Sequence, residues 1–452
     1  MRRPLALLLL LAGTYLPAAC SAPSADPAPV VAAVPHKTVA PTPVPVDPTN
    51  TAVPAPEPPT STPAPPPTIA LDTKEIQKEL VQIEADTTKM RGLKPKKPVP
   101  AHFISPDQMK YSLTQQTLKG YTQEMATRDA TRLWLSLLID NRDTDFRQME
   151  SDFAGQAVLG YYDNQEKQLY VRMDGTSTTL SPGAKETLAH EYVHSLQDQY
   201  YNLQTLRSKE GDSDRSLAVT ALIEGDATVS GLLYASQYMT RREFDQSFQD
   251  NGEMGQPVPG RQPVYLEQSW QFPYTYGAHF VFSLGTLGDY RPVNAAFKNP
   301  PRSTEQIMHP QKYLSKTPDE PINVELPALT STLGQGWKAT ETDTVGEFEL
   351  SLMLKELYVE DPNATAGWGG GKYTLYENGK DALIIMGTRW DTKRDLQEWE
   401  DALQQGFNLF SKNQGYWTDR GRIWGEARSG ETVMFVSGTD LAAVQHVMAT
   451  FK

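Results

Sequence analysis

Two histidines that lie four residues apart, His190 and His194, constrain the fold of this chain more than any other feature. Residues i and i+4 share one face of an α-helix, so both imidazoles reach a single ion only if the segment is helical. Glu191 directly follows the first histidine and completes the His-Glu-x-x-His spacing of zinc hydrolases. The motif therefore predicts a helix with His190 and His194 as zinc ligands and Glu191 as the general base.

The residues around the motif favour the same helix. Ser181 is a suitable N-cap, and Pro182 suits the first helical position. Leu188, Tyr192 and Leu196 recur every four residues. We therefore expect one face of the helix to meet an ion and the apolar face to point away from it.

A second expected helix, over residues 214–239, offers a third ligand. Glu224 lies in it, about thirty residues after His194, among small and apolar residues that allow close helix packing. A catalytic zinc takes three protein ligands and leaves one position open, so Glu224 completes the set. Asp226 could hold a ligating histidine through an outer hydrogen bond. The alternative is that both acids are ordinary solvated side chains.

At these residues the chain resembles the gluzincin type of zinc metallopeptidase, whose third ligand is a glutamate on a helix downstream of His-Glu-x-x-His. The segments 190–199, 224–227, 300–310 and 366–370 are similar to a group of largely uncharacterised bacterial surface lipoproteins, and the similarity spans residues 103–452. The resemblance implies Zn²⁺ held by the two histidines and the downstream glutamate, in a mostly helical zincin-like domain. The chain departs from thermolysin in the longer gap to the third ligand.

Hydrolysis of this kind also requires donors for the oxyanion that forms when water adds to a carbonyl. Tyr276, His279 and His309 are the candidates in the sequence. Each also has a structural interpretation, because histidines and tyrosines outside a motif are more often packed or capping residues. The expected catalytic set is Glu191 with Tyr276 and His309.

The N-terminus predicts export and a lipid anchor. Arg2 and Arg3 precede an apolar run over residues 5–11, which is typical of a secretory signal and too short to span a membrane. Cys20 follows this run and is the only cysteine of the chain, which favours lipidation. Pro17 stands where lipoprotein signals usually carry an aliphatic residue, so the alternative is a cysteine that is removed or left free.

The chain beyond the signal divides into a tether and two expected domains. Residues 21–68 are rich in proline and cannot bury a core, so they predict an extended spacer. Residues 69–320 are the expected zincin-like domain and residues 321–452 a small α+β sandwich, which makes the predicted fold class α+β. The net charge of −13 argues against nucleic acid as a partner.

The first domain is expected to contain helices over residues 76–90 and 117–138. Strands over residues 159–162 and 169–171 predict a hairpin just before the motif helix. An edge strand of such a hairpin could pair with an extended peptide, or it could simply complete a sheet.

The second domain is expected to alternate paired strands with helices. Its predicted elements are a helix over residues 345–357, a glycine-rich loop over 367–371, two strands joined at Asn378 and Gly379, a helix over 392–410, strands over 422–426 and 432–436, and a final helix from Asp440. Trp368, among the glycines, could cover a cleft or could be a core residue.

Two classes of function are compatible with these patterns. The first is a zinc peptidase that is lipid-anchored at the outer face of the cytoplasmic membrane and acts on proteins or peptides. The second is a surface binding or assembly lipoprotein whose zinc site is structural or vestigial. Glu191 favours the enzyme, because a structural site requires ligands but no adjacent base.

Overall fold

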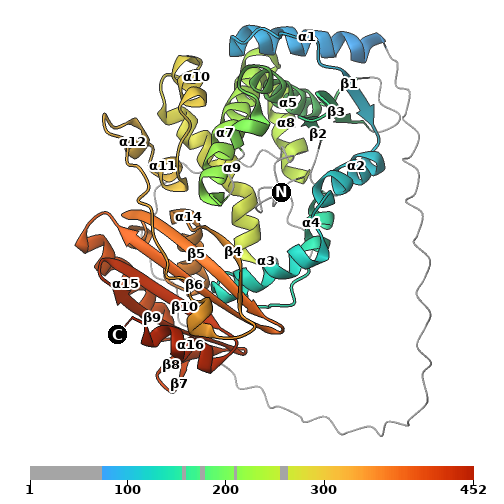
Figure 1. The fold of residues 1–452 in the computed structure, drawn as a ribbon. Helices are drawn as coiled ribbons and strands as arrows, with labels where there is room; N and C mark the ends of the chain where they lie inside the picture. The colour runs from blue at the N-terminus through green and yellow to red at the C-terminus, as the bar shows by residue number, and fades with distance from the viewer. Residues whose placement is uncertain (1–73, 155–158, 174–178, 208–210, 255–262, 452) are drawn as a thin grey trace, which may run out of the picture. The chain divides into compact units, whose positions relative to one another are not determined.

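The structure is a computed structural model that describes residues 74–154, 159–173, 179–207, 211–254 and 263–451 (Figure 1). These residues belong to one compact unit that combines helices with antiparallel and mixed sheets, so the predicted α+β class is confirmed. The predicted signal segment, Cys20 and the proline-rich tether lie outside the described residues. The predicted boundary between residues 320 and 321 stays a prediction.

The helices that precede the large sheet carry the predicted metal-binding residues. They are α1 Lys74–Arg91, α2 Pro106–Leu118, α3 Gln123–Leu135, α4 Phe146–Ala154, α5 Pro182–Tyr201, α6 Leu203–Arg207, α7 Ser213–Tyr238, α8 Arg241–Met254, α9 Val264–Ser283, α10 Arg291–Lys298, α11 Thr304–Met308, α12 Pro310–Leu314 and α13 Thr330–Leu333. A small sheet lies among them, with strands β1 Ala101–Ile104, β2 Gly160–Asp163 and β3 Gln168–Arg172 in the order β1-β3-β2.

Helix α5 begins where predicted, and α7 begins and ends within one residue of the predicted range 214–239. Ser181 caps α5 by accepting a hydrogen bond from the Ala184 amide, as the sequence predicts. The apolar face with Leu188, Tyr192 and Leu196 packs into a core with α1 and β3. The helix capping and the apolar repeat therefore identify this element correctly.

Helix α7 is the central helix of this region and packs most extensively against α9. The two helices cross at Gly225 and Gly277, where a Cβ added to Gly225 would lie 2.2 Å from the Gly277 backbone. By length and composition α7 could cross a membrane, but 89% of its most apolar 18-residue window is buried inside the protein. In this structure it is a core helix that brings Glu224 against α5.

The predicted helix over residues 117–138 is confirmed only for its central part, residues 123–135 of α3. The chain instead forms α2 and α3, and Thr122 starts α3 by accepting a hydrogen bond from the Met125 amide. The cap signal at Thr122 outweighs the apolar repeat that continues through it. The predicted core residues Leu133, Trp134, Leu137 and Leu138 are all buried.

The hairpin before α5 is confirmed. Strands β2 and β3 pair antiparallel from Gly160 opposite Val171 to Asp163 opposite Gln168. In the small sheet β2 is an edge strand, and it contacts α5. An edge strand therefore lies beside the helix that carries the motif.

The C-terminal region is built on a larger sheet with the order β4-β5-β6-β10-β9-β8-β7. Its strands are β4 Lys338–Thr344, β5 Trp368–Asn378, β6 Asp381–Trp390, β7 Ser411–Asn413, β8 Tyr416–Asp419, β9 Arg422–Ser429 and β10 Thr432–Gly438. Its helices are α14 Glu347–Glu356, η1 Pro362–Ala364, α15 Lys393–Phe407 and α16 Leu441–Ala449. The predicted strands and helices are present, and the sequence reading missed β4, β7 and β8.

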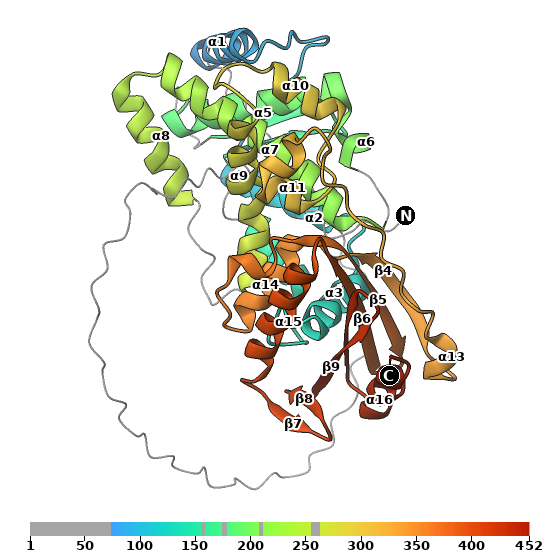
Figure 2. The ribbon, with the colours of Figure 1, turned by 90° about the vertical axis from the view of Figure 1, so that its left-hand side faces the viewer.

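Helices α15 and α16 cover opposite faces of this sheet (Figure 2). Ile384 and Met386 of β6 belong to the core that contains α15, whereas Leu383 and Ile385 belong to the core that contains α16. This alternation is what the period of two along a strand requires. The C-terminal region is therefore an α+β sandwich, as predicted.

The predicted glycine-rich loop over residues 367–371 is wrong. Strand β5 begins at Trp368, which is buried in the core. A Cβ at Gly370 would lie 2.2 Å from the Ile322 carbonyl oxygen, so glycine here permits close passage of another segment.

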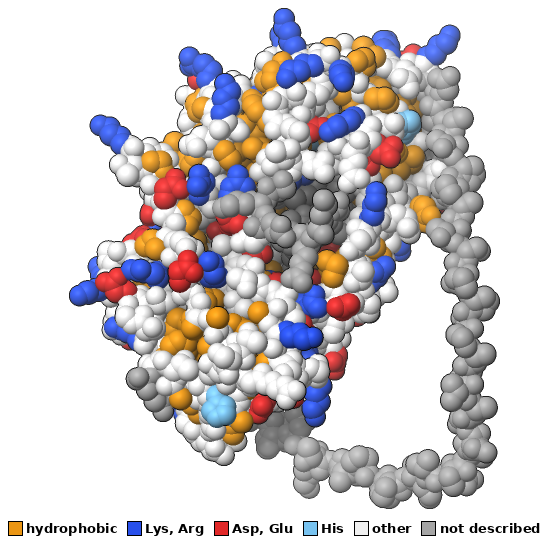
Figure 3. Space-filling model, in the orientation of Figure 1, with side chains coloured by type: hydrophobic (Ala, Val, Ile, Leu, Met, Phe, Trp, Pro, Cys, Tyr) orange, Lys and Arg blue, Asp and Glu red, His pale blue; other side chains and the backbone are white. Residues whose placement is uncertain are grey.

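Charges of both signs are interspersed over the face shown in Figure 3, so the net charge of −13 is not concentrated there.

Candidate metal centre

The contact between α5 and α7 brings the three predicted ligands together. His194 Nε2 lies 3.0 Å from His190 Nε2 and 3.1 Å from Glu224 Oε2, and His190 Nε2 lies 3.4 Å from Glu224 Oε2. All three side chains are buried. The sequence spacing therefore corresponds to one compact cluster of two nitrogen atoms and one oxygen atom.

The shape of this cluster fits a tetrahedral zinc site. With zinc–ligand distances of ~2.0–2.1 Å, two ligand atoms of a tetrahedron are about 3.3 Å apart, close to the three separations here. Buried Glu224 Oε1 has no hydrogen-bond partner in the described structure. Two imidazoles and one carboxylate are a donor set that zinc prefers, and three protein ligands leave a fourth position open.

A glutamine orients the second histidine. His194 Nδ1 lies 2.9 Å from Gln197 Oε1, and Gln197 Nε2 donates to Asp226 Oδ2 at 2.7 Å. Asp226 therefore does not hold a histidine directly, as we expected it could, but acts one residue further out. The sequence reading missed Gln197, although it lies one helical turn after His194 on the same helix.

The electrostatics of the cluster favour a bound cation. Burial lowers the pKa of His190. Burial also acts to lower the pKa of His194, but the negative charges of Glu224 and Glu191 outweigh it and raise that pKa to about 9. For Glu224, burial acts to raise the pKa, and the two histidines outweigh it and lower the pKa. The buried carboxylate thus requires a positive charge at this point, either a proton or a metal ion.

The predicted base, Glu191, lies beside the cluster on α5. A carboxylate oxygen of Glu191 and a ring nitrogen of each histidine all lie within 4.8 Å of one another. Glu191 Oε2 accepts a hydrogen bond from the Tyr162 amide of β2 at 2.8 Å. Burial raises the pKa of Glu191 to about 8. A pKa close to the working pH suits a group that both takes up and returns a proton.

Two further side chains next to the cluster were not predicted. Arg207, at the end of α6, places Nη2 3.8 Å from Glu224 Oε1, and its buried Nε has no hydrogen-bond partner in the described structure. Burial lowers the pKa of Arg207. The ring of Tyr274, on α9, lies 6.4 Å from that of His190. No motif identifies these residues, because only the fold brings α6 and α9 to α5.

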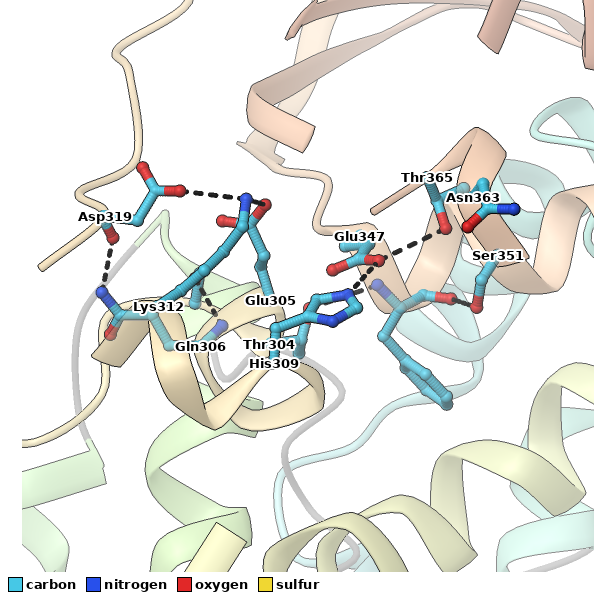
Figure 4. A network of polar contacts seen from close by, with 12 residues as sticks. Thr304, Glu305, Gln306, His309, Lys312, Asp319, Glu347, Ser351, Asn363 and Thr365 are labelled. Atoms are coloured by element: carbon cyan, nitrogen blue, oxygen red, sulfur yellow. Dashed lines mark hydrogen bonds and ion pairs between the residues drawn. The ribbon is translucent and has the colours of Figure 1, made fainter. Parts of the chain in front are cut away.

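The predicted oxyanion donors are placed elsewhere. His309 Nε2 lies 2.9 Å from Glu347 Oε1, between α11 and α14 (Figure 4). Tyr276 stacks on Phe272, and His279 is exposed. Within the described part of the chain, none of the three side chains forms a hydrogen bond or ion pair with the ligand cluster. Arg207 and Tyr274 are therefore the better candidates for donors.

A second group of acids in Figure 4 surrounds a lysine. Lys312 Nζ lies 2.5 Å from Glu305 and 2.9 Å from Asp319, both labelled in Figure 4, and 2.7 Å from Asp391. The ammonium group already occupies the centre of these carboxylates. This cluster therefore joins α11 and α12 to the end of β6 by ion pairs, in a place where a metal ion would compete with the lysine.

The comparisons with known proteins concern mainly the C-terminal region. A family model described as a domain of unknown function (DUF8575) matches residues 332–448, from just before β4 to the last turns of α16. Comparison with curated proteins and with solved structures gave no match. The match does not include His190, His194 or Glu224, so it carries no information on the candidate metal centre.

Proposed function

We propose that this protein is a zinc-dependent hydrolase of peptide bonds, a metallopeptidase of the gluzincin type. The observation that carries the proposal is the buried triangle of His190 Nε2, His194 Nε2 and Glu224 Oε2, with Glu191 beside it. Glu191 favours catalysis over a purely structural site, because a structural zinc needs four ligands and no base.

The side chains divide the chemistry among them. His190, His194 and Glu224 would hold a zinc ion, which when bound supplies a Lewis acid for the carbonyl and activates water. Glu191 accepts the proton of the attacking water and returns it to the departing amine nitrogen. Arg207 and Tyr274, which lie next to Glu224 and His190, would donate hydrogen bonds to the oxygen atom of the carbonyl as it gains negative charge.

A peptide substrate is favoured by the strand next to the base. β2 is an edge strand, and the Tyr162 amide of this strand holds Glu191 Oε2. An extended peptide that pairs with a strand edge gains main-chain hydrogen bonds that do not depend on its sequence. A substrate bound along β2 would lie close to Glu191.

The proposed location is the cell surface, with the folded part held by a lipid on Cys20 and by the proline-rich residues 21–68 as a spacer. The lone cysteine after an apolar run supports this proposal. Wild-type protein should partition with membranes and Cys20→Ser should appear in the medium. Unmodified wild-type protein that is soluble outside the cell would contradict the anchor.

The test of the proposed activity compares Glu191→Gln with a matched change on the same helix. Casein and a mixed peptide library are incubated with the wild type, Glu191→Gln and Glu186→Gln, and bound zinc is measured in each. Glu186 is also a buried glutamate of α5 but lies outside the group of Glu191 with the two histidines. We expect Glu191→Gln alone to lose cleavage while it keeps zinc. Zinc without cleavage in the wild type would favour the binding or assembly lipoprotein instead.

A further inference from the structure

A buried chain of polar contacts runs from the proposed ligand His194 to the N-terminal helix α1. His194 Nδ1 meets Gln197 Oε1, and Gln197 Nε2 donates to Asp226 Oδ2. Arg91, the last residue of α1, donates to the same Asp226 oxygen from Nε at 3.1 Å and from Nη2 at 2.9 Å. These hydrogen bonds thus connect residues 91, 194, 197 and 226, which lie on three different helices.

The chemistry of each group determines which atom donates and which accepts in this series of hydrogen bonds. A carboxylate accepts hydrogen bonds only, so Asp226 requires the NH₂ group of Gln197 to face it. The second amide hydrogen of Gln197 is used by the Ile223 carbonyl oxygen at 3.1 Å. Gln197 Oε1 is therefore left for His194, which must donate from Nδ1. The Nε2 atom of His194 then keeps its lone pair for the ligand cluster, as metal binding requires.

Arg91 is the charged partner of Asp226. The side chains of both residues are completely buried, and Arg91 also donates to Asn294 Oδ1 at 2.9 Å and lies 4.4 Å over the Tyr290 ring. A carboxylate that is buried without a partner is strongly destabilised, so Asp226 depends on this guanidinium. Among the described residues, Arg91 forms no hydrogen bond or ion pair with His190, His194 or Glu224.

We propose that Arg91 is a positioning residue that raises zinc affinity through Asp226 and Gln197, which makes α1 a part of the metal centre. This inference rests on the proposed zinc site. It goes further by assigning a role in metal retention to the first described helix, which follows the proline-rich residues. Loss of α1 would then release the metal without any change in a ligand.

The test measures zinc affinity of the full chain by competition with a chromophoric chelator. Changes of outer hydrogen-bond partners typically weaken metal binding 10–100-fold, and we expect Arg91→Met to weaken zinc binding by roughly this factor. In a Gln197→Leu background, Arg91→Met should cause little further loss, because the connection is already broken. Additive losses would overturn the proposal, as would wild-type affinity in folded Arg91→Met.

A matched control separates a specific effect on zinc affinity from a general loss of stability. Arg132→Met removes another buried guanidinium, which pairs with Glu349 at 2.5 Å. We expect it to lower the thermal midpoint while zinc affinity stays within about twofold of wild type. An equal loss of zinc affinity in this variant would contradict the assigned role of Arg91. If Arg91→Met does not fold, Arg91→Lys carries the same test, because it keeps the charge but loses the forked contact.

The outcomes also distinguish this inference from the proposed function. A wild-type chain that binds no zinc would sink both. A wild-type chain that binds zinc, with Arg91→Met binding it equally well, would remove the role of Arg91 and leave the proposed hydrolase untouched.

Discussion

Helices α5 and α7 and the region around the large sheet both contain many buried side chains, but these side chains differ in kind. Between the helices, burial encloses His190, Glu224 and Asp226. Around the sheet, burial encloses large apolar side chains such as Trp399 of α15 and Trp424 of β9. Polar groups that are enclosed together must satisfy one another or a ligand, whereas apolar groups need only fill space. Substitutions between the helices should therefore change chemistry, and substitutions in the sheet should change stability.

The largest effect on the helical side is expected from Glu191→Gln. The amide keeps the size of the side chain but cannot accept a proton from water, so turnover should fall by roughly 10²–10⁴-fold. Peptidase rates measured beside zinc content check this prediction. Unchanged turnover in Glu191→Gln would show that the proposed base is not the base.

The corresponding change in the C-terminal region is Trp399→Ala, on the helix that covers one face of the sheet. Trp399 is buried on α15 and stacks on Trp390 with ring centroids 5.1 Å apart. Truncation of a buried tryptophan typically costs about 3–5 kcal/mol, so the denaturant midpoint should fall strongly. Zinc affinity of the folded fraction should stay at the wild-type value. A large loss of zinc affinity would show that the two regions are not as separate as we argue.

A buried acid outside the proposed metal centre, Glu150, should make the stability of the protein depend on pH. Burial and the charge of Asp129 raise the pKa of Glu150, on α4, to about 8, against an ordinary value of 4.5. Between these values the folded protein binds the additional proton, so stability falls as pH rises and the loss is complete above about pH 8. Glu150→Gln removes this dependence.

We therefore expect Glu150→Gln to be more stable than the wild type at pH 9, by a few kcal/mol, and nearly equal to it at pH 4.5. Denaturant unfolding of both proteins across this range gives the difference. Exposed Glu360→Gln is the control and should show no such trend. A constant difference between the wild type and Glu150→Gln at every pH would exclude the raised pKa.

The smallest effect is expected at Tyr276. Its ring packs on Phe272, away from the ligands, so Tyr276→Phe should change turnover by less than about threefold. Tyr274→Phe removes the hydroxyl of the tyrosine near His190 and should reduce turnover by about 10–10³-fold. The two rates, measured in one assay, compare neighbouring tyrosines of α9. A larger loss of turnover in Tyr276→Phe than in Tyr274→Phe would support Tyr276 as the oxyanion donor, as the sequence predicts.

The sequence identified the elements whose signals are local. Ser181 marks the start of α5, and the spacing of His190 and His194 requires a helix, so both could be read without a structure. Glu224 could be added because apolar and small residues define α7 clearly. The break before α3 was missed, because the cap at Thr122 lies inside a continuous apolar pattern.

The missed parts of the site depend on contacts between distant segments. Arg91 reaches Asp226 across 135 positions of the chain, and no local pattern indicates this pair. Arg207 and Tyr274 reach the ligands only because α6 and α9 pack beside α5 and α7. His309 is the opposite example. The sequence predicts it as an oxyanion donor, whereas in the structure its side chain pairs with Glu347. Tertiary packing decides which polar residues share a site.

Zinc analysis of the wild-type chain and of Glu224→Ala tests the central claim most directly. We expect one tightly bound zinc per wild-type chain and, in Glu224→Ala, a loss of affinity larger than the roughly 10–100-fold of outer hydrogen-bond changes. A wild-type chain without zinc, or Glu224→Ala with undiminished zinc, would contradict the metal centre described here.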